Sequence, residues 1–146
     1  MILVKRSRII NTNMKKFSLI TTVILFGFFL ISCKKEAGDG GNSTIYGKII
    51  ARNYNAEFTQ LKGVFNAPDE DVFIIFGNDR SFSERTRTNY DGVYEFKYLR
   101  PGSYTIYAYS KDSTLTLPSE LTTVIRKVEI SDKKQTVEAA DMIIIK

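Results

Sequence analysis

The chain has 146 residues, with no histidine, one cysteine, and 21 basic against 16 acidic residues. The lack of histidine removes the commonest general base and metal ligand, and a single cysteine excludes an internal disulfide and a zinc site made of several thiolates. The formal net charge of +5 arises entirely before residue 17, and the rest of the chain carries 16 residues of each sign. Because nucleic-acid binders need a basic surface on the folded domain, we expect no nucleic-acid partner.

Residues 1–32 have the pattern of an export signal. Two lysines at positions 15 and 16 precede the apolar run Phe17–Ile31, which at 15 residues is short for a membrane-spanning helix. The following residues Leu30-Ile31-Ser32-Cys33 resemble the bacterial lipobox. This resemblance implies cleavage before Cys33 and attachment of a diacylglycerol to its thiol. An uncleaved N-terminal membrane anchor is the alternative.

Two boundaries follow from this interpretation. Met14 directly precedes the lysine pair, so a start of translation at Met14 is a further hypothesis. Residues 33–43 (CKKEAGDGGNS) are polar and rich in glycine, and they are interpreted as the lipidated Cys33 and a flexible tether. Residues 44–146 are then sufficient for a single domain with one core.

From Thr44 onward the apolar residues alternate with a period of two, as in half-buried strands. No segment shows a clear helical period. Asp91-Gly92 and Pro101-Gly102 are strong turn signals between alternating segments. The pattern predicts seven strands, near residues 44–50, 71–78, 83–89, 93–99, 103–110, 121–130 and 136–145. Such a series is typical of an all-β, antiparallel Greek-key sandwich.

The segment Thr86–Ile106 (TRTNYDGVYEFKYLRPGSYTI) resembles the carboxypeptidase regulatory-like domain, which has a transthyretin-like (prealbumin-like) sandwich fold. The matching positions are Gly92, Tyr94, Phe96, Leu99, Pro101, Gly102, Tyr104 and Ile106. Ile45-x-Gly47-x-Ile49 resembles the opening strand of that family and Val72-x-Ile74 the second. The resemblance covers about residues 44–146 and implies a seven-stranded sandwich. Asn89 in place of an acidic residue, and the long segment Tyr54–Pro68, depart from the family pattern.

Residue parity on the strands divides core from surface. Tyr94, Phe96, Tyr104 and Ile106 share one parity and are predicted to meet inside the domain. Four other tyrosines are predicted to be exposed and to contact a ligand: Tyr46, Tyr98, Tyr107 and Tyr109. Exposed tyrosines on a sheet can stack on sugars or form a flat protein-binding surface. In the alternative interpretation, the apolar residues of Tyr54–Pro68 cover one outer face. The loops 54–68 and 112–119 are further contact candidates.

Two sets of acidic residues are candidate chemical sites. Asp69-Glu70-Asp71 with Asn78 and Asp79 could supply calcium ligands, but their spacing matches no calcium-loop signature, and solvated charges at strand ends are the favoured interpretation. Glycoside hydrolysis needs a pair of carboxylates, for which the candidates are Glu84, Asp91, Glu95 and Asp112. Nothing in the sequence places any two of them together. We therefore expect no enzyme, no metal and no cofactor.

The sequence as a whole predicts a lipid-anchored, non-catalytic module at the outer membrane that binds carbohydrate or protein. Whether it faces the periplasm or the cell surface is open. One alternative is a periplasmic accessory lipoprotein that docks onto an outer-membrane uptake or peptidase system. Another is a fragment of an enzyme whose catalytic domain is encoded elsewhere. The ligand and the oligomeric state are not predicted.

Overall fold

The computed structural model describes residues 36–114 and 120–146. The predicted signal peptide, Cys33 and the boundary at Met14 lie outside the described residues. In the described part of the chain no helix is long and apolar enough to cross a membrane. All regular structure there is β, in nine strands: β1 (Asp39–Tyr54), β2 (Leu61–Asn66), β3 (Asp71–Phe76), β4 (Glu84–Arg87), β5 (Val93–Leu99), β6 (Gly102–Lys111), β7 (Leu121–Ile130), β8 (Thr136–Glu138) and β9 (Met142–Ile145).

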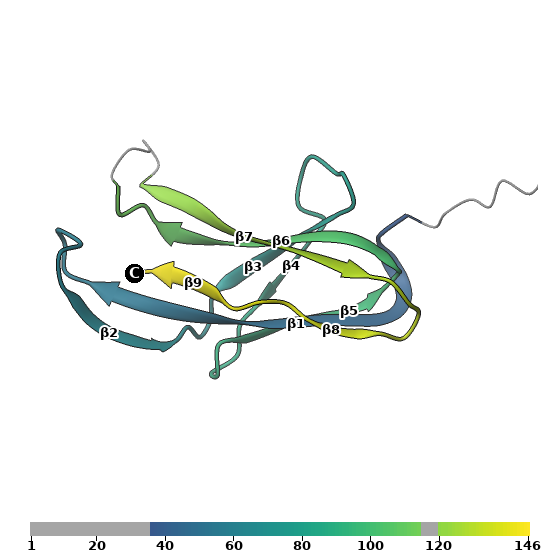
Figure 1. The fold of residues 1–146 in the computed structure, drawn as a ribbon, viewed down its shortest axis with the longest axis horizontal. Helices are drawn as coiled ribbons and strands as arrows, with labels where there is room; N and C mark the ends of the chain where they lie inside the picture. The colour runs from purple at the N-terminus through teal and green to yellow at the C-terminus, as the bar shows by residue number, and fades with distance from the viewer. Residues whose placement is uncertain (1–35, 115–119) are drawn as a thin grey trace, which may run out of the picture. The chain divides into compact units, whose positions relative to one another are not determined.

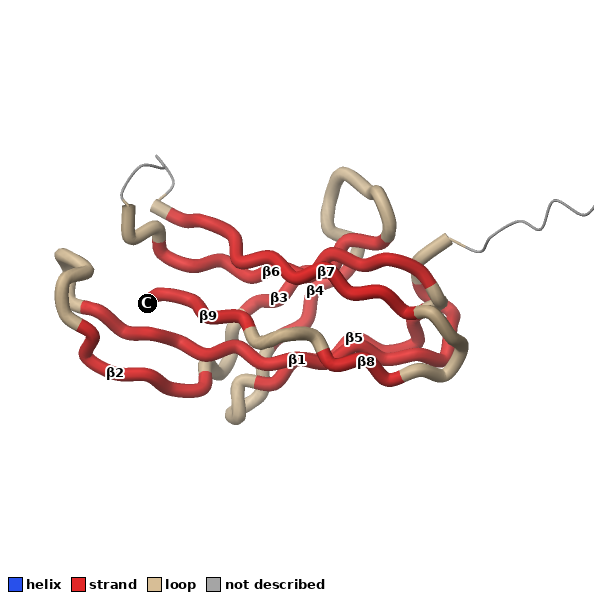
Figure 2. Tube along the Cα trace, in the orientation of Figure 1, coloured by secondary structure: helices blue, strands red, loops and turns tan. Residues whose placement is uncertain are grey.

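The strands form two sheets that face each other (Figure 1). One sheet contains β2, β1 and β5, with β8 and β9 also paired to β1. The other has the order β4-β3-β6-β7. Figure 2 shows strands in both layers and short loops at their ends. The predicted all-β sandwich is therefore confirmed.

The long strand β1 is the centre of its sheet. At Ile49 one edge of β1 changes partner, because the N–H of Ile49 donates to Gly92 O at 2.8 Å and its carbonyl accepts from Ala67 N at 3.0 Å. β5 therefore pairs with the first half of this edge and β2 with the second. The other edge pairs in the same way, first with β8 and then with β9, both parallel to β1.

The prediction of seven strands, all antiparallel, is wrong in two respects. The described residues form nine strands, and β8 and β9 pair with β1 in parallel. The segment 54–68, expected as a loop, contributes β2 because the Asn55 side chain closes a tight turn: its Oδ1 accepts the N–H groups of Thr59 and Gln60, each at 2.9 Å. The last predicted strand is divided into β8 and β9. Between them, Arg126 Nε donates to the carbonyl oxygens of Ala140 at 3.2 Å and Asp141 at 3.1 Å, so a side chain replaces the sheet partner there.

The domain also begins earlier than predicted. Residues 39–43, assigned to a flexible tether, are the first residues of β1. The N–H of Gly38 donates to the Tyr104 hydroxyl at 3.1 Å, and the carbonyl of Gly38 accepts from Arg100 N at 2.8 Å. Backbone hydrogen bonds therefore hold the second half of the predicted tether against the fold.

The core lies between the sheets and consists mainly of side chains of one parity on each strand. On β5 the alternation shifts at Tyr98, whose φ is 60°, so that Tyr98 is exposed and Leu99 is buried. Tyr94, Phe96, Tyr104 and Ile106 are all buried, as their parity predicted. They are joined by residues from β1, β3 and β9, including Ile45, Ile49, Val72, Ile74, Met142 and Ile144. Side chains of the opposite parity point outward and are available to form surface sites.

Candidate functional site

The outer face of the β4-β3-β6-β7 sheet carries a cluster of four aromatic side chains, which we call the aromatic platform: Phe73, Phe82, Tyr107 and Tyr109. Phe73 on β3 lies directly opposite Tyr107 on β6. Their rings are stacked, with centroids 5.1 Å apart and planes at 14°. Phe82, from the loop after β3, meets the Phe73 ring edge-on at 5.2 Å, and Tyr109 meets it edge-on at 5.7 Å.

This cluster is exposed although its rings contact one another. Phe82 is 51% exposed and Tyr109 47%. Ile125 on β7, which lies opposite Tyr107, is 49% exposed and extends the apolar surface. Burial, and then the neighbouring Tyr109, raise the pKa of Tyr107. The platform offers broad ring surface together with tyrosine hydroxyl groups.

The structure divides the four predicted contact tyrosines between two sheets. It brings Tyr107 and Tyr109 together, with a centroid distance of 5.8 Å. Tyr46 lies on β1, in the opposite sheet, beside Glu138, and a hydrogen bond to that carboxylate is the main reason that its pKa is raised. Tyr98 is exposed on β5 with a φ of 60°, also in the opposite sheet. Tyr46 and Tyr98 are therefore not part of the platform.

The segment 54–68 does not cover the platform, so that alternative interpretation is wrong. Its strand β2 pairs with β1 and extends the opposite sheet. Leu61, Val64 and Phe65 remain 47%, 56% and 47% exposed. The exposure of these side chains shows that they have not found the packing surface that was expected for them.

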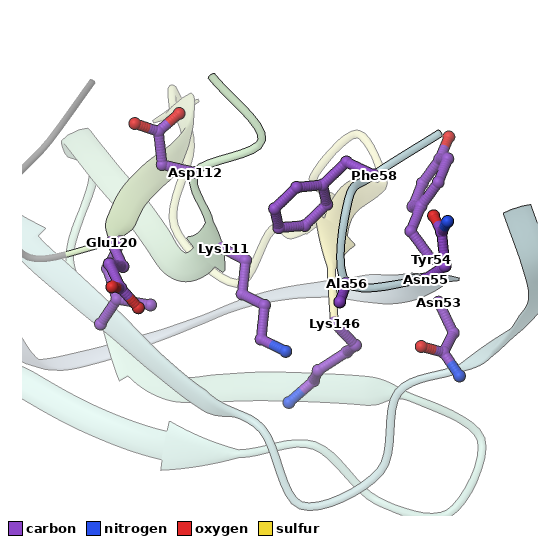
Figure 3. A pocket seen from close by; sticks show the side chains of 10 residues that line it. Asn53, Tyr54, Asn55, Ala56, Phe58, Lys111, Asp112, Glu120 and Lys146 are labelled. Atoms are coloured by element: carbon purple, nitrogen blue, oxygen red, sulfur yellow. The ribbon is translucent and has the colours of Figure 1, made fainter. Parts of the chain in front are cut away.

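At the end of the sandwich where β1 and β6 finish, two adjoining pockets of about 500 and 470 Å³ form what we call the end groove. Both pockets are lined by Tyr54, Lys111 and Asp112. The first also has Phe58, Glu120 and Lys146 in its wall, and the second has Arg52. Figure 3 shows the Phe58 ring between Lys111 and Tyr54. The loops 54–68 and 112–119 were predicted as contact regions, and their described residues meet at this groove.

The acidic candidates are engaged or dispersed. Arg87 bonds Asp69 at 2.9 Å and Asp71 at 3.0 Å, as expected for charged residues at a strand end. Glu95 pairs with Lys97 at 2.9 Å, and Asp91 lies in the turn before β5. Burial, and then Asp39, raise the pKa of Glu84 on β4. Asp112 directly follows β6, and β3 lies between β4 and β6 in the sheet. Within residues 36–114 and 120–146, no group of three acidic, cysteine or histidine side chains could hold a metal ion.

Sequence reasoning missed Phe73 and Phe82. Phe73 lies in the continuous apolar run Asp71–Asn78, which was interpreted as a strand covered on both faces. In fact Val72 and Ile74 are buried, whereas Phe73 and Ile75 point outward and are only partly covered. Residue parity on this strand, compared with Tyr107 and Tyr109, could have found Phe73. Phe82 lies in a loop, where no periodic signal exists.

Comparisons with known proteins were made by family, by sequence and by structure. No protein-family model matches the chain, and no curated protein matches it in sequence. Among solved structures, a proposed carbohydrate-binding protein from Pseudomonas aeruginosa superposes with a TM-score of 0.43 and 15% sequence identity. The match covers 71% of this chain and 91% of that one. Similarity at this level transfers neither a fold family nor a function.

Proposed function

We propose that this protein is a lipid-anchored, non-catalytic module of the bacterial cell envelope, and that its aromatic platform binds carbohydrate. The observation that carries the proposal is the arrangement of Phe73, Phe82, Tyr107 and Tyr109 on one open sheet face. Rings held by each other in a rigid sheet lose little conformational freedom when a ligand stacks on them.

The chemistry of the platform suits a sugar. The apolar faces of sugar rings stack on aromatic side chains, and tyrosine hydroxyl groups can exchange hydrogen bonds with sugar hydroxyl groups. Because the platform is open rather than enclosed, it would suit a chain of sugars lying along the strands better than a single small molecule.

The location is proposed from the sequence. The lipobox-like Leu30–Cys33 supports cleavage and lipid attachment at Cys33, and Lys34 after it supports transport to the outer membrane. The match of residues 86–106 to the carboxypeptidase regulatory-like pattern supports a transthyretin-like Greek-key sandwich.

The test is a binding assay on a panel of polysaccharides with the full chain in detergent. We expect Tyr109→Ala and Phe82→Ala each to weaken binding about tenfold or more, because loss of a stacked ring removes roughly 1–3 kcal/mol. Tyr90→Ala is the matched control, since Tyr90 is a 94% exposed aromatic residue in the turn before β5, remote from the platform in the fold. Equal binding by all three variants would contradict the proposal.

A specific observation favours a second candidate function. The edge strand β2 exposes Leu61, Val64 and Phe65, and its outer edge has no partner within the described residues. An exposed apolar edge strand can pair with an extended segment of another protein. Docking onto an envelope uptake or peptidase system through β2 would be supported if Val64→Lys abolished co-purification of an outer-membrane protein while Tyr109→Ala did not.

A further inference from the structure

The aromatic platform and the end groove are parts of one surface along β6. Tyr107, Tyr109 and Lys111 have the same parity on this strand, so they point to the same outer face at steps of about 7 Å. The residue opposite Lys111 on β7 is Leu121, and both line the end groove. A ligand that lies along β6 on the platform therefore reaches the groove at its next contact.

The groove contains two positive side chains that form no ion pair within the described part of the chain. Lys146 forms an ion pair with Glu70, whereas Arg52 and Lys111 form none with any residue of 36–114 or 120–146. Two cations therefore remain available for an anionic group of a ligand. Both line the second of the adjoining pockets.

The acids in the groove do not compete strongly for these cations. The Asp112 carboxylate is buried, and its Oδ1 accepts hydrogen bonds from Thr114 N at 2.9 Å and Thr114 Oγ1 at 2.6 Å. Figure 3 shows the carboxylate of Asp112 pointing away from the ammonium group of Lys111. Glu120 is exposed and forms no ion pair with a described residue.

We infer that the ligand is an acidic polysaccharide. Its sugar rings stack on Tyr107 and Tyr109, and a carboxylate of the same chain enters the end groove between Lys111 and Arg52. A guanidinium group can hold a carboxylate by two parallel hydrogen bonds, and the ammonium group of lysine adds a compact charge. The inference rests on the proposed function, since it takes the platform to be a carbohydrate site, and adds the charge of the ligand.

The experiment compares acidic polymers with their neutral derivatives. The full chain in detergent is titrated at low ionic strength with polygalacturonate, alginate and hyaluronate, and with the methyl ester of each. Esterification keeps the sugar rings and removes the charge. For at least one polymer we expect binding about tenfold tighter in the acid form, and a loss of this preference as salt is raised.

Three variants locate the charge recognition. Lys111→Gln and Arg52→Gln should each remove most of the preference for the acid form. Lys127→Gln is the matched control, because Lys127 is an exposed lysine on the same sheet face, six residues along β7 from Leu121. It should retain the full preference.

The outcomes separate this inference from the proposed function. Equal binding of acid and ester, weakened in both by Tyr109→Ala, would overturn the acidic ligand and leave the carbohydrate platform standing. An acid preference that Lys127→Gln removes as strongly as Lys111→Gln would overturn the groove as the site of recognition. Failure of all six polymers to bind would overturn the inference, and unchanged binding by Tyr109→Ala would count against the platform itself.

Discussion

Tyr94 has a buried hydroxyl group that makes no hydrogen bond to any described residue. Tyr94 lies opposite Gly47 on β1, and a Cβ atom at position 47 would overlap the hydroxyl group. Gly47 is therefore required by close approach rather than by backbone conformation. Burial raises the pKa of Tyr94 to about 12. This side chain fills the core with its ring but leaves its polar atom unsatisfied.

We predict that Tyr94→Phe stabilises the protein, because an unsatisfied buried hydroxyl costs free energy that phenylalanine avoids. The free energy of unfolding at pH 7 should rise by about 1 kcal/mol. The pKa of Tyr94 is about 12 in the folded protein and near 10 in the unfolded chain. Its ionisation therefore lowers the free energy of unfolding as the pH rises from 10 to 12, and has no effect below pH 10.

Denaturant unfolding at pH 7 and pH 11 measures both effects. The gap in stability between Tyr94→Phe and wild type should be larger at pH 11. A variant that is less stable than wild type at pH 7 would show that the hydroxyl group has a partner after all. Parity alone predicted that Tyr94 is buried, but not that its hydroxyl lacks a partner, since this depends on atoms from β1 and on Arg126 and Asp141 nearby.

At the scale of elements, the N-terminal end of β1 shows how the chain before the strand is held. Gly38 is hydrogen-bonded to Tyr104 and Arg100, and the backbone at Gly41 passes so close to Leu99 that a Cβ atom would overlap its carbonyl. Glycines that were interpreted as a sign of flexibility in CKKEAGDGGNS thus serve close packing. Composition cannot distinguish these two uses of glycine, because both need a residue without a side chain.

We predict that Gly41→Ala detaches the start of β1 while the core remains folded. The amide of Arg100, which donates to Gly38, should then exchange its hydrogen at least tenfold faster. The matched control is Gly63→Ala in β2, where an added Cβ would meet nothing within 4 Å. Hydrogen exchange by mass spectrometry or NMR measures the effect, and unchanged protection of Arg100 in Gly41→Ala would refute the role given to this contact.

Most strands were predictable because alternation of apolar residues is a direct consequence of a half-buried sheet. The strands β3, β5, β6 and β7 were found close to their observed bounds for this reason. β2 was missed because it has little buried surface: its residues LKGVFN are largely exposed on both faces. The break between β8 and β9 was missed because it depends on Arg126, a residue from a different part of the chain.

At the scale of the whole molecule, the two outer sheet faces have different surfaces. The outer face of the β4-β3-β6-β7 sheet carries the aromatic platform, whereas the other sheet carries Tyr46 opposite Glu95 and Lys48 opposite Val93. The candidate site was half predictable, since parity identified Tyr107 and Tyr109. Residue parity could not show that Tyr46 and Tyr98 lie on the other sheet, because the assignment of strands to sheets depends on pairing between distant segments.

We predict that Cys33 determines where the molecule resides. Radioactive palmitate should label the wild-type protein in cells and should not label Cys33→Ala, and the variant should leave the membrane fraction or persist as an uncleaved precursor. Cys33→Ser is a second control that keeps the size of the residue. Labelling of Cys33→Ala would contradict the lipid attachment. Protease treatment of intact cells then decides the face, since only a surface-exposed domain is digested before lysis.

The position of β1 has a mechanical consequence. β1 is the first strand of the domain and also the strand to which β2, β5, β8 and β9 are all paired. Tension that arrives through the chain before Glu36 therefore acts along the axis of the central strand. Its hydrogen bonds lie across that direction, so they are sheared together rather than opened one after another. A domain pulled in this direction should therefore resist unfolding at its N-terminal end.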